Sequence, residues 1–184
     1  MPRVLIPLAP GCEELEAVTL IDLLRRAEID VVVAGIEPGP VTASRGTVLI
    51  PDVELDDVLA EDFDMILLPG GLPGATNLDR DERIHDLLAR QAAEERWIGA
   101  ICAAPKVLAN AGLLDGRDAT SYPGAVIATD FPEVRLLEDP VVVDGSVATS
   151  RGPGTAMDFS LQLIELLVGA ERRTAVESKL MRPD

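Results

Sequence analysis

The stretch WIGAICAAPKVLANAGLL, residues 97–114, places a cysteine between two different kinds of chain. Residues 97–101 form a short apolar run typical of a buried strand, whereas the residues from Pro105 onward have helical spacing and a proline suited to a first helical turn. The sequence therefore predicts a sharp strand-to-helix corner at Cys102. Ala100 and Ala104 are small enough for such a corner, as in the nucleophile elbow of hydrolases.

On both sides of this corner, apolar runs alternate with helical patterns. Strand-like runs occur at residues 3–9, 29–35, 64–69 and 97–102, and helical patterns occur at 13–27 and 81–96. This alternation predicts an α/β domain with a mostly parallel sheet and helices on both faces. Two hairpins are also expected, one within residues 41–53 and one with a two-residue turn at Asp144-Gly145.

The composition limits the domain count and the classes of partner. A chain of 184 residues is expected to form a single domain, residues 1–184, and its net charge of -16 disfavours nucleic acid and anionic membranes as partners. We expect a cytoplasmic protein, since residues 1–10 are too short an apolar run for a signal peptide and no run approaches about 18 apolar residues. Its two lysines among 16 basic residues fit either a saline cytoplasm or a GC-rich genome.

Two cysteines make neither a disulfide framework nor a zinc site. At the predicted corner the first amides of the following helix would lower the pKa of the Cys102 thiol and favour a reactive thiolate. The alternative is a buried structural cysteine. The single histidine, His85, falls at the edge of an apolar helical stripe, which indicates a surface residue and makes a Cys-His dyad improbable.

Carboxylates are the next candidate partners for the thiol. Glu13 and Glu14 are explained as acids that favour the first turn of a helix. Glu16 precedes Leu20 and Leu23 by four and seven residues, which aims it toward the buried side. A buried Glu16 carboxyl would have a raised pKa and could transfer a proton. Alternatively, Glu16 lies at the edge of the apolar stripe with its carboxyl group in water. Spacing alone leaves both positions open.

Glycine-rich loops and two arginines complete the candidate site. Gly70 and Gly71, after the apolar run at 65–68, offer unhindered amides to an oxyanion or form an ordinary tight turn. Arg151 and Arg45, each followed by glycine, could contribute positive charge for an anion.

Four motifs in this order resemble the ThiJ/PfpI superfamily over essentially the whole chain. They are LAPGCEELEAVTLIDLLRRA (8–27), LPGG (68–71), AICAAP (100–105) and TSRGPGTAMDF (149–159). The likeness is closest to its DJ-one branch, the parkinsonism-associated protein deglycase group, and to bacterial YajL-type members. The resemblance implies a flavodoxin-like three-layer sandwich that forms a homodimer and needs no cofactor and no metal.

The resemblance also implies roles for individual residues. Cys102 is the implied nucleophile and Glu16 its hydrogen-bonded acid, with the amides of Gly71 and Ala103 forming the oxyanion pocket. Arg45 and Arg151 would lie near the dimer-side mouth. This chain departs from many relatives in having Tyr122 where they have histidine, which leaves an aromatic group to line the pocket. Ala103 replaces the histidine of peptidase-like branches and argues against proteolysis.

Three functions follow as hypotheses. The first is a glyoxalase III-like or deglycase enzyme, a hydro-lyase or hydrolase, in which Cys102 attacks methylglyoxal-type α-oxoaldehydes or glycated protein adducts. The second is a redox-sensing, chaperone-like stress protein that uses oxidation of Cys102. The third is a dimeric scaffold with an inert cysteine. Cys12 is either a small-residue filler or a resolving thiol for oxidised Cys102.

Overall fold

Seven strands form one sheet in the order β10-β11-β7-β6-β1-β2-β5 in the computed structural model, which describes residues 1–182. All neighbouring pairs are parallel except β10 with β11. The strands are β1 (Arg3–Leu8), β2 (Asp30–Gly35), β5 (Val53–Glu54), β6 (Met65–Leu68), β7 (Trp97–Ile101), β10 (Val141–Asp144) and β11 (Val147–Ser150). The predicted mostly parallel sheet is confirmed.

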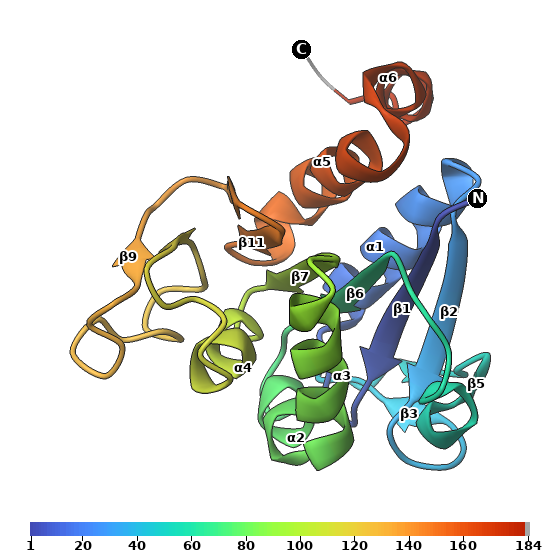
Figure 1. Cartoon of the computed structure of the whole chain (residues 1–184). Coiled ribbons are helices and arrows are strands. Elements are labelled where there is room, and N and C mark those ends of the chain that lie inside the picture. The colour runs from blue at the N-terminus through green and yellow to red at the C-terminus, as the bar shows by residue number, and fades with distance from the viewer. Residues whose placement is uncertain (183–184) are drawn as a thin grey trace.

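Helices cover both faces of this sheet (Figure 1). One layer contains α1 (Glu14–Arg26) and α5 (Ala156–Val168), which pack on each other, with α6 (Ala170–Glu177) against α5. The other layer contains α2 (Gly74–Arg80), α3 (Glu82–Ala93) and α4 (Pro105–Asn110). The α/β prediction of a flavodoxin-like three-layer sandwich is therefore confirmed.

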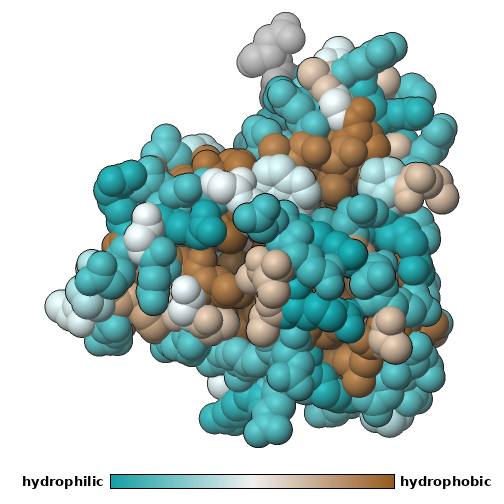
Figure 2. Space-filling view, viewed as in Figure 1, coloured by the Kyte–Doolittle hydropathy of each residue, from teal (hydrophilic) through white to brown (hydrophobic). Residues whose placement is uncertain are grey.

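Apolar patterning explains the layers. Every residue of β6 is buried, as expected of a central parallel strand with helices on both sides. Helix α1 turns Ala17, Leu20 and Leu24 toward the sheet, and these side chains are at most 2% exposed. The outer surface is mostly hydrophilic in the view of Figure 2, in keeping with the strong net negative charge. Among residues 1–182, no helix has both the length and the apolar character needed to cross a bilayer.

Short elements form the edges. β3 (Val41–Thr42) and β4 (Val48–Leu49) make the predicted hairpin, and β8 (Asp118–Ala119) pairs with β9 (Arg135–Leu136). The 3-10 turns are η1 (Leu55–Val58) and η2 (Pro153–Thr155). The second hairpin forms, but its turn residues are Gly145 and Ser146, because Asp144 still pairs with Val147. The expected Asp144-Gly145 turn is therefore displaced by one residue.

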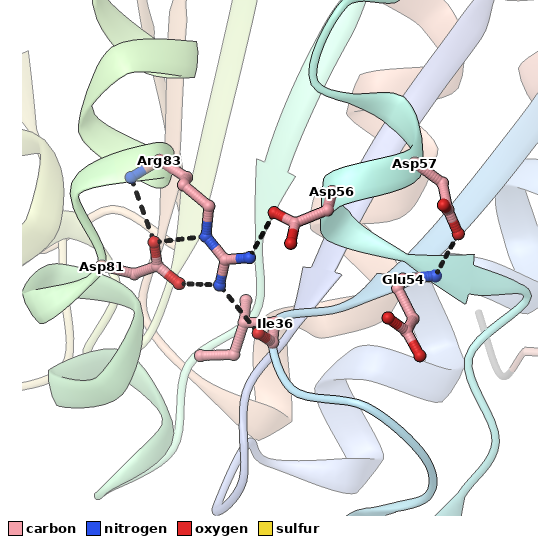
Figure 3. Close-up of polar contacts among 6 residues, drawn as sticks. All are labelled: Ile36, Glu54, Asp56, Asp57, Asp81 and Arg83. Atoms are coloured by element: carbon pink, nitrogen blue, oxygen red, sulfur yellow. Dashed lines mark hydrogen bonds and ion pairs between the residues drawn. The ribbon is translucent and has the colours of Figure 1, made fainter.

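Arg83 joins three segments on one side of the fold (Figure 3). Its guanidinium donates to Asp81 at the start of α3 and to Asp56 in η1, at 2.6–2.9 Å and 2.7 Å. It also donates to the carbonyl oxygen of Ile36, just after β2, at 2.7 Å. Hydrogen bonds to these carboxylates raise the pKa of Arg83 still further above its ordinary value, so its charge is permanent. One side chain thus ties α3 to the β2 edge of the sheet.

Candidate active site

The loops that follow β1, β6, β7 and β11 meet at one edge of the sheet. Because these four strands run parallel, their carboxyl ends share that edge. The chain goes from β1 to a neighbour on one side, β2, and then to a neighbour on the other side, β6. Ligand sites in open α/β sheets form at such a change of direction. Cys102 and Glu16 both lie at this edge, after β7 and β1 respectively.

Cys102 occupies the predicted corner. Its φ is +64°, a left-handed conformation that costs a non-glycine residue roughly 1–2 kcal/mol. Two backbone hydrogen bonds hold it there: its amide donates to Ser150 O at 3.0 Å, and its carbonyl accepts from Tyr122 N at 2.8 Å. The residue is 9% exposed. The elbow therefore presents a mostly buried sulfur at the carboxyl end of the sheet.

Glu16 is fully buried beside this thiol. Its Oε2 accepts a 2.9 Å hydrogen bond from the amide of Gly70. Burial raises the pKa of Glu16 to about 7, while hydrogen bonding to Cys102 and Gly70 partly opposes that shift. The other carboxyl oxygen, Oε1, has no hydrogen-bond partner among residues 1–182. A buried carboxyl with one unpaired oxygen is suited to holding a proton there.

The electrostatics of the thiol differ from the prediction. Burial and then the negative charge of Glu16 raise the pKa of Cys102 to about 12, whereas the amides of Gly71 and Ala103 lower it by less. The expected lowering by helix amides alone is therefore wrong in its net direction. Thiolate becomes accessible when Glu16 carries the proton, because the repulsion from its carboxylate is then absent. The ionisation of each group therefore depends on the other.

The loop after β6 needs glycine at two positions. A Cβ on Gly70 would lie 2.6 Å from Cys102 Cβ and 2.7 Å from Glu16 Oε2. Gly71 has a φ of +92°, and its missing side chain would meet the amide nitrogen of Glu13. These glycines let the loop approach the elbow so closely that the Gly71 amide, like the Ala103 amide, interacts with the sulfur and lowers its pKa. Both donors are in place for negative charge at this point.

A pocket of about 430 Å³ opens in front of the sulfur. Cys102 and four other candidate residues line it: Arg45, Gly71, Ala103 and Tyr122. Its other lining residues are Glu13, Ser44, Leu72, Pro123, Gly124, Ala125 and Pro153. This volume falls within the range of small-molecule sites.

The two arginines implied by the resemblance are placed differently. Arg45 lines the pocket, and its amide donates to both carboxylate oxygens of Glu14, at 3.0 and 3.1 Å. Arg151 does not line the pocket and donates instead to the carbonyl of Glu138 at 2.9 Å. Ser44, which the sequence did not single out, bonds Glu13 and Glu14 at 3.0 and 3.1 Å and so braces the pocket wall. Its position inside the predicted hairpin, just before Arg45-Gly46, was the one feature of the sequence that could have indicated this role.

The remaining candidates lie outside the pocket. His85, on α3, is half-buried, and its Nε2 lies 2.8 Å from Asp79 O. Cys12 is 1% exposed, and burial raises its pKa to about 11. Both cysteines are free thiols. Within residues 1–182, no three histidine, cysteine or acidic side chains are grouped so as to hold a metal ion.

Known proteins match this sequence and fold. The family model described as DJ-1/PfpI family matches residues 2–166. Protein DJ-1 homolog A of Arabidopsis thaliana is 43% identical over 173 residues, covering 93% of this chain but 44% of that protein. The chain therefore spans less than half the length of that relative.

Two further matches extend over nearly the full length of both proteins. Glutathione-independent glyoxalase DJR-1.2 of Caenorhabditis elegans is 38% identical over 173 residues, covering 94% of this chain and 92% of that protein. The crystal structure of Drosophila melanogaster DJ-1beta superposes with a TM-score of 0.94 at 40% identity, covering 100% of this chain and 99% of that one. Similarity thus includes every element that positions Cys102 and Glu16.

Proposed function

The chain belongs to the DJ-1/PfpI family, and from this premise we propose that it is a cofactor-free, cysteine-dependent glyoxalase or deglycase. Its substrates are methylglyoxal-type α-oxoaldehydes or the adducts these aldehydes form on amines and thiols. The observation that carries the proposal is the set of groups that interact with the Cys102 sulfur: the Glu16 carboxyl and the amides of Gly71 and Ala103. A relative named as a glutathione-independent glyoxalase supports this choice.

The first half of the proposed reaction is addition to the aldehyde. Cys102 thiolate attacks the aldehyde carbon while Glu16 carries a proton. The carbonyl oxygen becomes negatively charged, is stabilised by the Gly71 and Ala103 amides and then takes the Glu16 proton. The product is a hemithioacetal on Cys102, and Glu16 is now a carboxylate. In a deglycase reaction the adduct first releases its amine or thiol, and the freed aldehyde then reacts with Cys102 in the same way.

The second half rearranges the bound carbons. Glu16 carboxylate removes the proton from the carbon attached to sulfur, which gives an enediol, and then returns a proton to the neighbouring carbon. The result is a thioester of lactate on Cys102. Water hydrolyses it, releasing lactate and restoring the thiol, so methylglyoxal plus water becomes lactate without an external oxidant or reductant. The pKa of about 7 on Glu16 suits a group that must give and take a proton near neutral pH.

Lactate formation from methylglyoxal by purified protein tests the proposal. The assay omits glutathione and includes a chelator, so that contaminating glyoxalases are silent. We expect turnover in the wild type and in the matched control Cys12→Ala, and none in Cys102→Ala. Turnover that survives in Cys102→Ala, or a wild type without turnover, overturns the proposal. An inactive wild type that forms Cys102 sulfinate readily would favour the redox-sensing alternative.

The same family membership leads us to propose a homodimer. Leu15 and Val18 on α1 are 50% and 46% exposed, which leaves apolar side chains on the outer face of that helix. Arg45, on the hairpin turn, lines the pocket near the start of this helix. An α1-mediated dimer would therefore lie close to the pocket mouth.

A further inference from the structure

A second cavity of about 220 Å³ adjoins the Cys102 pocket. The two share four lining residues: Leu72, Ala103, Gly124 and Ala125. The second cavity adds Ala75, Thr76, Asp79, Lys106 and Val107, and we call these five residues the annex. Because the two cavities share these four residues and Cys102 lines the first, they lie side by side next to the nucleophile. The proposed reaction on methylglyoxal, whose tail is a single methyl group, leaves this space unused.

Lys106 gives the annex an available positive charge. It is exposed, lies four residues after Cys102 on α4, and makes no ion pair or side-chain hydrogen bond among the described residues. The chain has only one other lysine, Lys179, and carries a net charge of -16. Lys106 adds positive charge on the annex side of Cys102, apart from Arg45 in the first pocket. It opposes the repulsion that so acidic a chain exerts on anionic molecules.

The one acid of the annex already has partners. Asp79 Oδ2 accepts a 2.6 Å hydrogen bond from Asn110, and its Oδ1 lies 3.3 Å from His85 Nε2. The Asp79 carbonyl also lies 2.8 Å from the same histidine nitrogen. These neighbours orient the carboxyl, although Oδ1 has no hydrogen-bond partner among residues 1–182. Lys106 is the positively charged group among the lining residues of the cavity.

We propose that the annex binds a carboxylate carried on the tail of the substrate, with Lys106 as the specificity-determining residue. The inference rests on the proposed function and names its substrate class: α-oxoaldehydes with a carboxylate a few carbons from the dicarbonyl group. The simplest probe is 4,5-dioxopentanoate. Its dicarbonyl end reacts at Cys102 as methylglyoxal does, and its two methylene groups pass Ala103 toward Lys106. Addition of one water gives 2-hydroxypentanedioate: the aldehyde carbon is oxidised, the ketone carbon is reduced, and no co-reactant is needed.

The first test measures selectivity. The ratio of kcat/KM for 4,5-dioxopentanoate to that for 5-methyl-2-oxohexanal compares a charged tail with a neutral tail of similar shape. We expect Lys106→Gln to lower this ratio about fivefold, the effect of losing roughly 1 kcal/mol from a partly solvated charge pair. Lys106→Arg should retain most of the ratio, and Lys179→Gln, the matched control on the other lysine, should retain all of it. An unchanged ratio in Lys106→Gln overturns the proposal.

The second test needs no turnover and so separates this inference from the proposed function. 5-Chloro-4-oxopentanoate and 1-chloro-5-methylhexan-2-one are thiol-alkylating chloroketones, and they carry the same charged and neutral tails as the two aldehydes of the first test. We expect the ratio of their alkylation rates at Cys102, charged over neutral, to fall about fivefold in Lys106→Gln and to fall with added salt in the wild type. It should not change in Lys179→Gln. A Lys106-dependent ratio in a protein that forms no lactate keeps the anion site and rejects the glyoxalase, whereas lactate formation with a Lys106-independent ratio does the reverse.

Discussion

The amide of Gly70 donates a 2.9 Å hydrogen bond to Oε2 of Glu16, joining the loop after β6 to the first turn of α1. This bond holds one carboxyl oxygen and leaves the other without a strict partner at a fully buried position. The carboxyl is thereby held in one position beside Cys102. Its ionisation should be visible in the stability of the protein as well as in its chemistry.

Glu16→Gln should become more stable relative to the wild type as the pH rises. The folded-state pKa of Glu16, about 7, lies above its ordinary value of 4.5, so folded wild type holds the proton more tightly than unfolded chain does. Its unfolding free energy therefore falls as the pH rises from about 4.5 to about 7, by up to about 3 kcal/mol for a shift of this size. Glutamine does not titrate and escapes that loss. Urea unfolding of both proteins at pH 5 and pH 8 measures the difference, and equal differences at the two pH values would refute this account.

The same comparison in a Cys102→Ala background separates the carboxyl from the thiol. Burial is the largest cause of the raised Glu16 pKa, so the trend should persist without the sulfur. A trend that disappears with the thiol would show that Cys102 titration produced it.

Gly70→Ala should remove activity and destabilise the fold by about 1–3 kcal/mol. The new methyl group would lie 2.6 Å from Cys102 Cβ and 2.7 Å from the carbonyl oxygen of Ile101, so the elbow must shift. Gly154→Ala is the matched control, because a Cβ there meets nothing within 4 Å. Thermal unfolding and lactate formation measure both effects. Similar behaviour of the two variants would contradict the close packing of the loop against the elbow.

Arg83→Lys should cost about 1–3 kcal/mol although it keeps the charge. Lysine cannot reproduce the planar fork that reaches Asp81, Asp56 and the Ile36 carbonyl together. In the matched control Arg26→Lys, a half-exposed i,i+4 pair with Asp22 is altered, and we expect a loss below about 0.5 kcal/mol. Chemical unfolding compares the two. Equal losses would mean that the three-way contact in Figure 3 adds nothing beyond charge.

The proposed homodimer should be disrupted by a charge on α1. Leu15→Asp places a carboxylate among exposed apolar residues of that helix and should yield monomer, whereas Ile127→Asp, at a similarly exposed apolar position elsewhere, should not. Light scattering coupled to size-exclusion chromatography measures the molar mass and so distinguishes monomer from dimer. Because each chain carries a net charge of -16, the dimer should strengthen as salt screens repulsion between subunits. A wild type that stays monomeric at every salt concentration would reject the dimer.

Graded peroxide should oxidise Cys102 to sulfinate while Cys12 remains reduced. Cys12 is 1% exposed and, unlike Cys102, does not line the pocket, so peroxide reaches Cys102 first. Mass spectrometry of digested protein identifies the products. A Cys12–Cys102 disulfide that forms before any sulfinate would instead assign Cys12 a resolving role.

Local patterns predicted the elements that position the site. The apolar run at 97–101 followed by Pro105 predicted the elbow. As expected, β7 ends just before Cys102 and α4 begins at Pro105. The second hairpin forms with its turn one residue later than predicted. Gly145 and Ser146 make the turn, because Asp144 pairs with Val147. A two-residue turn signal is not precise enough to predict the position of a turn to one residue.

Long-range contacts explain what the sequence could not predict. The net effect on the Cys102 thiol depends on burial and on Glu16, which is 86 positions away in the chain and is brought close only by the parallel sheet. The backbone bonds of Cys102 to Ser150 and Tyr122 come from segments with no local signal of contact. Lys106 looked like an ordinary helix residue, because the cavity beside it is built partly by residues of α2 and of the 122–125 turn.

The left-handed backbone of Cys102 has an evolutionary consequence. Glycine adopts a φ of +64° without the cost that cysteine bears, and a single base change converts a cysteine codon into a glycine codon. A gene copy no longer selected for its chemistry therefore has a short mutational path along which the protein becomes inert and loses this backbone strain. Persistence of cysteine at this corner in descendants of the gene would record selection on reactivity against the preference of the backbone.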